Sequence, residues 1–199
     1  EIYRVALRAY SRDWQTAVHV IGDQAVREVL LAMEGLPRHA VRIEHGSLVS
    51  LDLLETISSL KPEIVVQPHF ILSDVWIEER LGARTRWVYA FKTLLENGAT
   101  LYGSSDSPVE PLNPWLGIYA AMHRGCTENL AICKYTSSEK LSFRQALEIY
   151  YRSPKRRPSL VILNITGAPD TRKEFEETRA VTIIAGGRIH ELPAGLLEK

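Results

Sequence analysis

Four side chains of the kinds that bind metal ions lie at or just beyond the ends of short apolar runs of the chain. His19, His45 and His69 are spaced 26 and 24 residues apart, and Asp106 comes just after the run at 100–103. Imidazole nitrogens and carboxylate oxygens are common zinc ligands, and a catalytic zinc keeps one coordination position for water. A metal-bound water gives up a proton near neutral pH, and a carboxylate beside it can accept that proton. These residue types predict a hydrolytic centre in which His19, His45 and Asp106 bind a divalent metal, zinc, and Asp106 also serves as the catalytic base.

The elements that must position these residues are alternating strands and helices. The apolar runs, with the glycines and prolines that end them, predict strands at 16–21, 40–44, 64–67 and 100–103. Helical spacing of apolar residues predicts helices at 1–10, 24–33, 51–60, 74–81 (capped by Ser73) and 89–96. Short apolar strands that alternate with helices indicate a parallel sheet. Functional groups collect beyond the carboxyl ends of such strands, so we expect the predicted ligands to converge there.

The sequence after residue 111 no longer alternates short strands with helices. This part of the sequence predicts helices at 115–122 and 142–151, a break at 152–158, and strands at 160–165, 181–185 and 188–191. A Gly186-Gly187 pair between the last two strands is a hairpin signal. We therefore expect an α/β region over residues 1–151 and a small C-terminal β element over residues 152–199.

Charge and composition exclude some classes of partner. Lys+Arg and Asp+Glu are both 24, so no net charge draws the chain to nucleic acid, and no apolar run is long enough to cross a membrane. Two cysteines, Cys126 and Cys133, form neither a disulfide framework nor a CxxC motif, so we expect reduced thiols and a cytoplasmic location. The chain begins at Glu1, inside a predicted helix, and we expect it to be a piece of a longer protein.

Four stretches resemble the metal-dependent amidohydrolases, in the branch that includes N-substituted formamide deformylase and the YtcJ-like proteins. They are AlaValHisValIleGlyAspGlnAlaVal at 17–26, ArgIleGluHisGlySerLeuVal at 42–49, ValGlnProHisPhe at 66–70, and the segment 103–121 with its AspSerProValGluPro motif. The resemblance covers residues 1–150 well and the tail loosely.

The resemblance implies a (β/α)8 TIM barrel with its active site at the carboxyl ends of the strands. It implies that His19 and His45 are the metal ligands of strands five and six, and that Asp106 is the strand-eight ligand and base. His69 lies where family members contact substrate. The tail strands would belong to the small β-sandwich of the family. The His-x-His pair of strand one and the lysine of strand four are absent, so the chain resembles the C-terminal half of such an enzyme.

The sequence is compatible with more than one function. The first is a hydrolase of carbon–nitrogen bonds in a small amide substrate, or a fragment of one. The alternative is a catalytically silent half-barrel, or an α/β module for binding or oligomerisation. A half-barrel leaves two sheet edges and an apolar inner face uncovered, so we expect self-association or pairing with a missing N-terminal half.

The expected roles of three charged side chains near the predicted site differ. Arg86 lies in a long loop expected near 81–87 and either contacts substrate as part of a lid or is only a surface residue. Glu44 should pair with a basic residue. Glu110 should be a solvated loop carboxylate, although it could line the pocket.

Overall fold

The computed structural model describes residues 1–151 and 159–191, and the chain divides into two compact units, Glu1–Tyr150 and Tyr151–Lys199. The elements up to the boundary are α1 (Ile2–Tyr10), β1 (Thr16–Val20), α2 (Asp23–Met33), β2 (Val41–His45), α3 (Leu54–Leu60), β3 (Glu63–Val66), α4 (Phe70–Ser73), α5 (Ile77–Leu81), α6 (Phe91–Glu96), β4 (Thr100–Gly103), α7 (Pro114–His123), α8 (Ile132–Thr136) and α9 (Phe143–Tyr151). They are followed by β5 (Leu160–Leu163), α10 (Arg172–Glu177), β6 (Ala180–Ala185) and β7 (Arg188–Glu191). Short 3-10 turns lie at Leu51–Leu53, Gly82–Trp87 and Ser137–Glu139.

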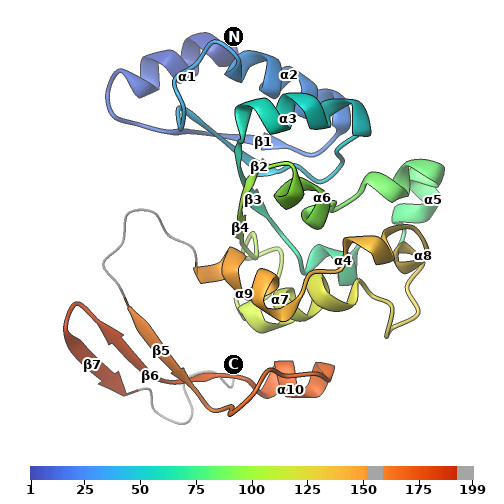
Figure 1. Ribbon diagram of the computed structural model, residues 1–199, viewed down its shortest axis with the longest axis vertical. Helices are drawn as coiled ribbons and strands as arrows, with labels where there is room; N and C mark the ends of the chain where they lie inside the picture. Colours follow the sequence, from blue (N-terminus) through green and yellow to red (C-terminus); the bar gives the residue numbers. More distant parts are fainter. Residues whose placement is uncertain (152–158, 192–199) are drawn as a thin grey trace. The chain divides into compact units, whose positions relative to one another are not determined.

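The first unit is built on a parallel sheet with the strand order β1-β2-β3-β4. Consecutive strands are neighbours, and each is joined to the next by helical segments, as in successive βα units of a barrel. Figure 1 shows α2 and α3 side by side near the sheet, while α1 and α2 pack on β1 and α6 packs on β4. The predicted fold class is confirmed: four parallel strands with covering helices form half of a TIM barrel, and a separate small β element follows in the sequence.

One face of the sheet is covered because its side chains are apolar. Strand register aligns Val18, Ile43, Ile64 and Leu101 in one row, and the last three are at most 1% exposed. Burying an aliphatic side chain of this size contributes roughly 2 kcal/mol, so this row holds the helices on the sheet.

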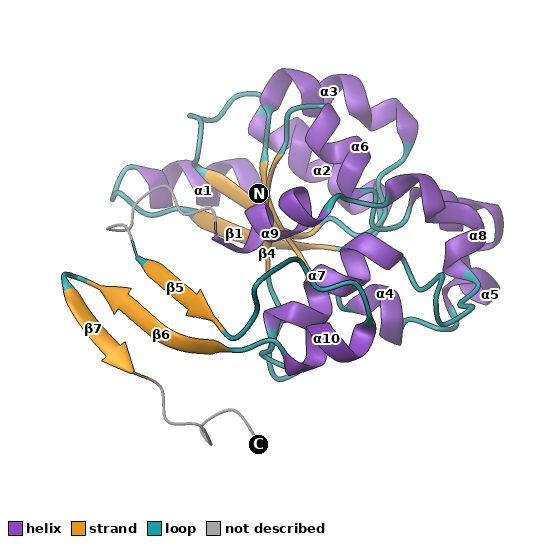
Figure 2. Ribbon diagram, turned by 60° about the horizontal axis from the view of Figure 1, so that its bottom comes forward, coloured by secondary structure: helices purple, strands orange, loops and turns teal. Residues whose placement is uncertain are grey.

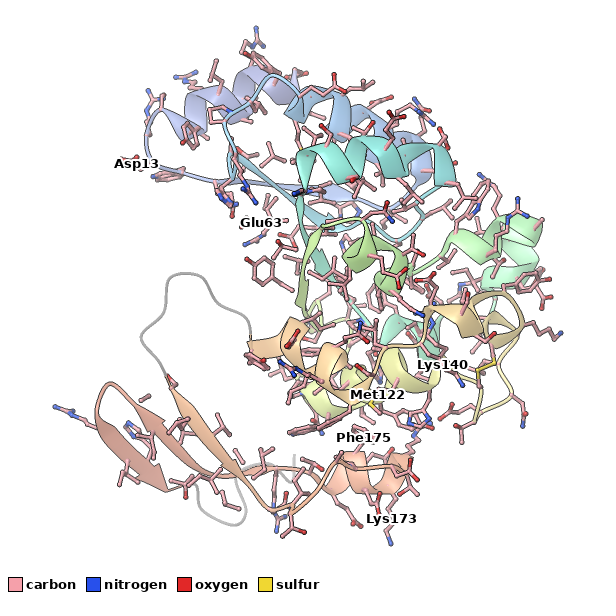
Figure 3. The ribbon with its side chains drawn as sticks, in the orientation of Figure 1. Asp13, Glu63, Met122, Lys140, Lys173 and Phe175 are labelled. Carbon is pink, nitrogen blue, oxygen red and sulfur yellow. A yellow bond between two sulfur atoms is a disulfide. The ribbon has the colours of Figure 1, made fainter. Side chains whose placement is uncertain are left out.

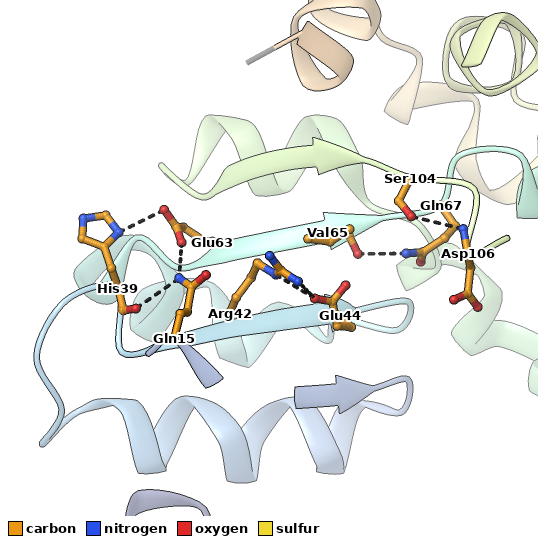
Figure 4. Close-up of polar contacts among 9 residues, drawn as sticks. All are labelled: Gln15, His39, Arg42, Glu44, Glu63, Val65, Gln67, Ser104 and Asp106. Atoms are coloured by element: carbon orange, nitrogen blue, oxygen red, sulfur yellow. Dashed lines mark hydrogen bonds and ion pairs between the residues drawn. The ribbon is translucent and has the colours of Figure 1, made fainter. Parts of the chain in front are cut away.

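The opposite face is more accessible and polar, and the expectation of an apolar inner face was wrong. Arg42 donates from Nε to Glu44 Oε1 at 2.7 Å, which confirms the expected basic partner of Glu44. At the amino ends of the strands, Glu63 accepts from Gln15 at 2.6 Å and contacts His39 Nδ1 at 3.0 Å (Figure 4). Polar side chains predominate on this face, and strand alternation separates them from the apolar row.

The second unit contains an antiparallel sheet in the order β5-β6-β7 (Figure 2). The predicted hairpin is present: Gly186 and Gly187 have φ of 59° and 75°, which glycine adopts without steric cost. Helix α10 begins with a capping box, in which Thr171 accepts from the Glu174 backbone N–H and the Glu174 side chain accepts from the Thr171 backbone N–H. The break predicted at 152–158 lies outside the described residues.

Expectations about the segment 73–87 and about the two thiols were wrong. Instead of one helix over 74–81, two short helices, α4 and α5, flank a turn, and Ser73 ends α4 rather than capping a helix. The long loop expected near 81–87 is helical.

Cys126 and Cys133 form a disulfide, visible as a sulfur–sulfur bond in Figure 3. The turn between α7 and α8 brings the two thiols together, which their spacing of seven does not reveal. The disulfide also removes the reduced-thiol argument for a cytoplasmic location. Within the described residues, no helix is long and apolar enough to span a bilayer.

Candidate functional site

His19 and His45 lie side by side at the carboxyl ends of β1 and β2. Their ring centroids are 4.5 Å apart, and the rings meet edge to face at 72°. Strand register aligns His19 with Glu44, so these two side chains share one face of the sheet. Regular strand alternation would therefore place His45, the next residue, on the opposite face from His19. A left-handed φ of 72° at His45 ends that alternation, and histidine is one of the residue types that tolerate this conformation.

A glutamine at the end of β3 orients the imidazole of His45. Gln67 donates from Nε2 to the backbone oxygen of Val65 at 3.2 Å, which leaves Oε1 facing His45 Nδ1 at 2.8 Å. An amide oxygen only accepts, so Nδ1 of His45 carries the proton and Nε2 presents a lone pair. The residue is 6% exposed, and its ring also stacks on Phe70. An imidazole that is oriented in this way binds metal ions in its neutral form.

Asp106 lies in the loop after β4, at the same end of the sheet as Gln67 (Figure 4). Its backbone N–H donates to Ser104 Oγ at 3.1 Å, and its φ is 53°. The side chain is exposed. Among residues 1–151 and 159–191, no three His, Cys, Asp or Glu side chains are grouped closely enough to hold a metal ion. The structure therefore brings together two of the three predicted ligands, and the three-ligand site stays a prediction.

His69 and Glu110 form a second polar group on this side of the sheet. His69 Nδ1 contacts Glu110 Oε2, and Ser73 donates from Oγ to Glu110 Oε1 at 2.5 Å. The side chains of His69 and Glu110 are 16% and 9% exposed. Glu110 is thus a largely buried, paired carboxylate, and the expectation of a solvated one was wrong. The sequence reading also missed Gln67 as a partner of a histidine.

A pocket of about 140 Å³ adjoins His69. Its wall includes Ser104, Ser105, Asn113, Leu112 and Tyr150. The ring of Tyr150 is packed against two glycines: a Cβ at Gly103 would lie 2.7 Å from its Cζ, and a Cβ at Gly117 would lie 1.9 Å from its Oη. Burial raises the pKa of the Tyr150 phenol, so its hydroxyl stays protonated at an alkaline pH where an exposed tyrosine ionises.

Arg86 is exposed, and its guanidinium lies over the ring of Trp87, 4.9 Å from the centroid. It is not among the residues that line the pocket beside His69. Its predicted contact with substrate stays a prediction.

Four parallel βα units with histidines at adjoining strand ends define half of a (β/α)8 barrel, a fold whose catalytic residues come from the ends of several strands. The sequence pattern of the Amidohydrolase family matches residues 1–157, and the chain belongs to this family.

Three relatives show how much of the family this chain represents. YtcJ of Bacillus subtilis (strain 168), an amidohydrolase by name, is 35% identical over 153 residues, which are 74% of this chain and 29% of that protein. The crystal structure of an uncharacterized metal-dependent hydrolase from Pyrococcus horikoshii OT3 has 43% identity and a TM-score of 0.70, over 75% of this chain and 30% of that one. A second uncharacterized metal-dependent hydrolase, from Pyrococcus furiosus, has 43% identity and a TM-score of 0.65 over the same shares. The chain therefore spans about 30% of the length of these relatives.

Proposed function

We propose that this chain is part of a metal-dependent hydrolase that cleaves carbon–nitrogen bonds of small, non-peptide amides. The observation that carries the proposal is the pair of imidazoles at adjoining strand ends, one of them held by Gln67 with its Nε2 lone pair available. Membership of the Amidohydrolase family and the metal-dependent hydrolases among similar structures support the same chemistry.

The described residues fit a metal ion in part. His19 and His45 would hold a divalent metal, zinc, through imidazole nitrogens, but a catalytic zinc usually takes three protein ligands and no group of three is assembled in the described part of the chain. When bound, such an ion would supply a water molecule of lowered pKa. Asp106, exposed beyond β4, would accept the proton of that water.

Thermal denaturation with and without ZnCl2 tests the metal proposal. An ion that binds only the folded chain raises stability by about 2.7 kcal/mol when its concentration is 100 times the dissociation constant. We expect zinc to raise the melting temperature of the wild type and to have little effect on His45→Asn. His39→Asn is the matched control, because His39 is exposed at the opposite end of the strands and bonded to Glu63. Equal zinc responses in all three proteins would rule out the assignment.

A second candidate function is an oligomerisation module without activity of its own. The observation that favours it is the open sheet: within the described residues, β1 and β4 are edge strands with a neighbour on one side only. Unpaired strand edges are templates for pairing with another chain. The partner would be a second copy or the remaining part of a longer protein. Sizing by light scattering decides it: a particle of 22.5 kDa at all concentrations would exclude self-association.

A further inference from the structure

The contact between His69 and Glu110 determines which nitrogen of His69 can exchange a proton. A carboxylate only accepts hydrogen bonds, so the proton of this contact is on Nδ1 of His69. Ser73 donates to the other oxygen of Glu110 and limits the rotation of the carboxylate. Since the Glu110 side chain is only 9% exposed, these two donors replace most of its contact with water.

Nε2 of His69 is the nitrogen left for a ligand. His69 lines the pocket of about 140 Å³. Within residues 1–151 and 159–191, the hydrogen bonds of the His69 ring all involve Nδ1. With the Nδ1 proton held by Glu110, Nε2 accepts a hydrogen bond when the ring is neutral and donates one when it is protonated.

We propose that Glu110, held by Ser73, is a positioning residue that fixes His69 so that proton exchange with a ligand in the pocket passes only through Nε2. The ligand is a small polar molecule with a nitrogen atom that can share this proton, such as an amide or the amine formed from it. A catalytic role of His69 in amide hydrolysis extends this proposal and rests on the proposed function.

In the proposed hydrolysis, protonated His69 gives the proton on Nε2 to the amide nitrogen as the carbon–nitrogen bond breaks. The electron pair of that bond passes to the nitrogen, the hydroxyl of the attacking water remains on the carbon, and the proton of the water goes to Asp106. Return of that proton from Asp106 through solvent restores both groups. General acid catalysis of this kind contributes on the order of 10²-fold or more to the rate.

Nitrogen-15 NMR of the histidine-labelled 199-residue chain, at a pH where the rings are neutral, tests the positioning directly. We expect His69 to carry its proton on Nδ1, and His69→Asn identifies its signals by removing them. In Glu110→Leu we expect the proton of His69 to move to Nε2. His39 is an internal control, because its Nδ1 faces Glu63 at 3.0 Å and should not change.

The wild-type spectrum is decisive even if a variant does not fold: a neutral His69 protonated on Nε2 would refute the proposal. An unchanged His69 in a folded Glu110→Leu protein, with His39 signals intact, would refute it equally. The catalytic extension is measured separately, as a fall in kcat on the order of 10²-fold with little change in KM for Glu110→Leu. If the longer protein that contains this chain hydrolyses no amide, the proposed function and the catalytic extension fail, while the NMR result still decides the positioning.

Discussion

Replacing Arg124 with methionine tests how the carboxyl-terminal end of α7 is anchored to the rest of the barrel unit. The Arg124 side chain is fully buried. Its Nη1 donates to the backbone oxygen of Tyr89 at 3.0 Å, its Nη2 donates to that of Val88 at 3.2 Å, and its Nε donates to Thr136 Oγ1 at 3.3 Å. Desolvation lowers the pKa of the guanidinium to about 10, whereas nearby Glu139 raises it, so Arg124 remains charged at neutral pH.

The expected cost follows from the groups that lose a partner. Methionine keeps the aliphatic stem, and Thr136 keeps its bond to the backbone oxygen of Ile132 at 2.9 Å. The oxygens of Val88 and Tyr89 each lose a charged donor, and such hydrogen bonds are worth about 1.5–3 kcal/mol each. Removing the buried charge recovers part of this sum. We therefore expect Arg124→Met to lower the free energy of unfolding by roughly 3 kcal/mol.

Urea unfolding followed by tryptophan fluorescence measures the effect. With a typical slope of about 1–3 kcal/mol per molar urea, the midpoint should fall by about 1 M or more. Arg144→Met is the control, because the Arg144 side chain is 88% exposed and is paired with Glu148 on the same helix, and we expect a change of at most about 0.5 kcal/mol. A midpoint for Arg124→Met as close to the wild type as that of the control would refute the reasoning.

Three further changes should have measurable effects. A raised pKa means that folded Tyr150 keeps its proton above pH 10 while the unfolded chain releases it, so this contribution to stability is complete below pH 10 and lost as pH rises. Tyr150→Phe should therefore make the alkaline loss of stability shallower by about 1.4 kcal/mol per pH unit, and parallel pH profiles would contradict this. Gly117→Ala should cost about 1–3 kcal/mol because its Cβ would meet Tyr150 Oη, and less when combined with Tyr150→Phe; additive effects in a double-mutant cycle would show that the two do not touch. Opening the Cys126–Cys133 disulfide with a reductant should cost roughly 2.5 kcal/mol from loop-closure entropy, and the Cys126→Ser, Cys133→Ser protein should show no response to reductant.

The βα core could be predicted from the sequence because local and tertiary preferences agree there. Each of the four strands combines apolar or β-branched residues with a glycine or polar residue at its end, and all four occur within a residue or two of the expected bounds. The segment 70–87 could not be predicted in the same way. Its short helices depend on tertiary contacts, such as the bond from Tyr135 to Glu78 at 2.7 Å, rather than on capping or periodicity.

The site was predictable only where a residue type carries its own chemical signal. Histidines after strands could be singled out, and two of them meet as expected. Gln67 and Glu110 could not be assigned as histidine partners, because an amide or carboxylate in a loop has no sequence pattern that tells which group it faces. The pairing of Cys126 with Cys133 depended in the same way on the path of the chain between α7 and α8.

The left-handed backbone at His45 and Asp106 limits how these positions can be probed by mutagenesis. Both have φ between 50° and 75°, a region where asparagine, aspartate and histidine occur far more readily than other side chains. An alanine scan would therefore combine two losses, the reactive group and the local backbone geometry, and would exaggerate the contribution of either side chain. Asparagine removes the imidazole or the charge while tolerating the same dihedral angles, so it is the cleaner probe at both strand ends.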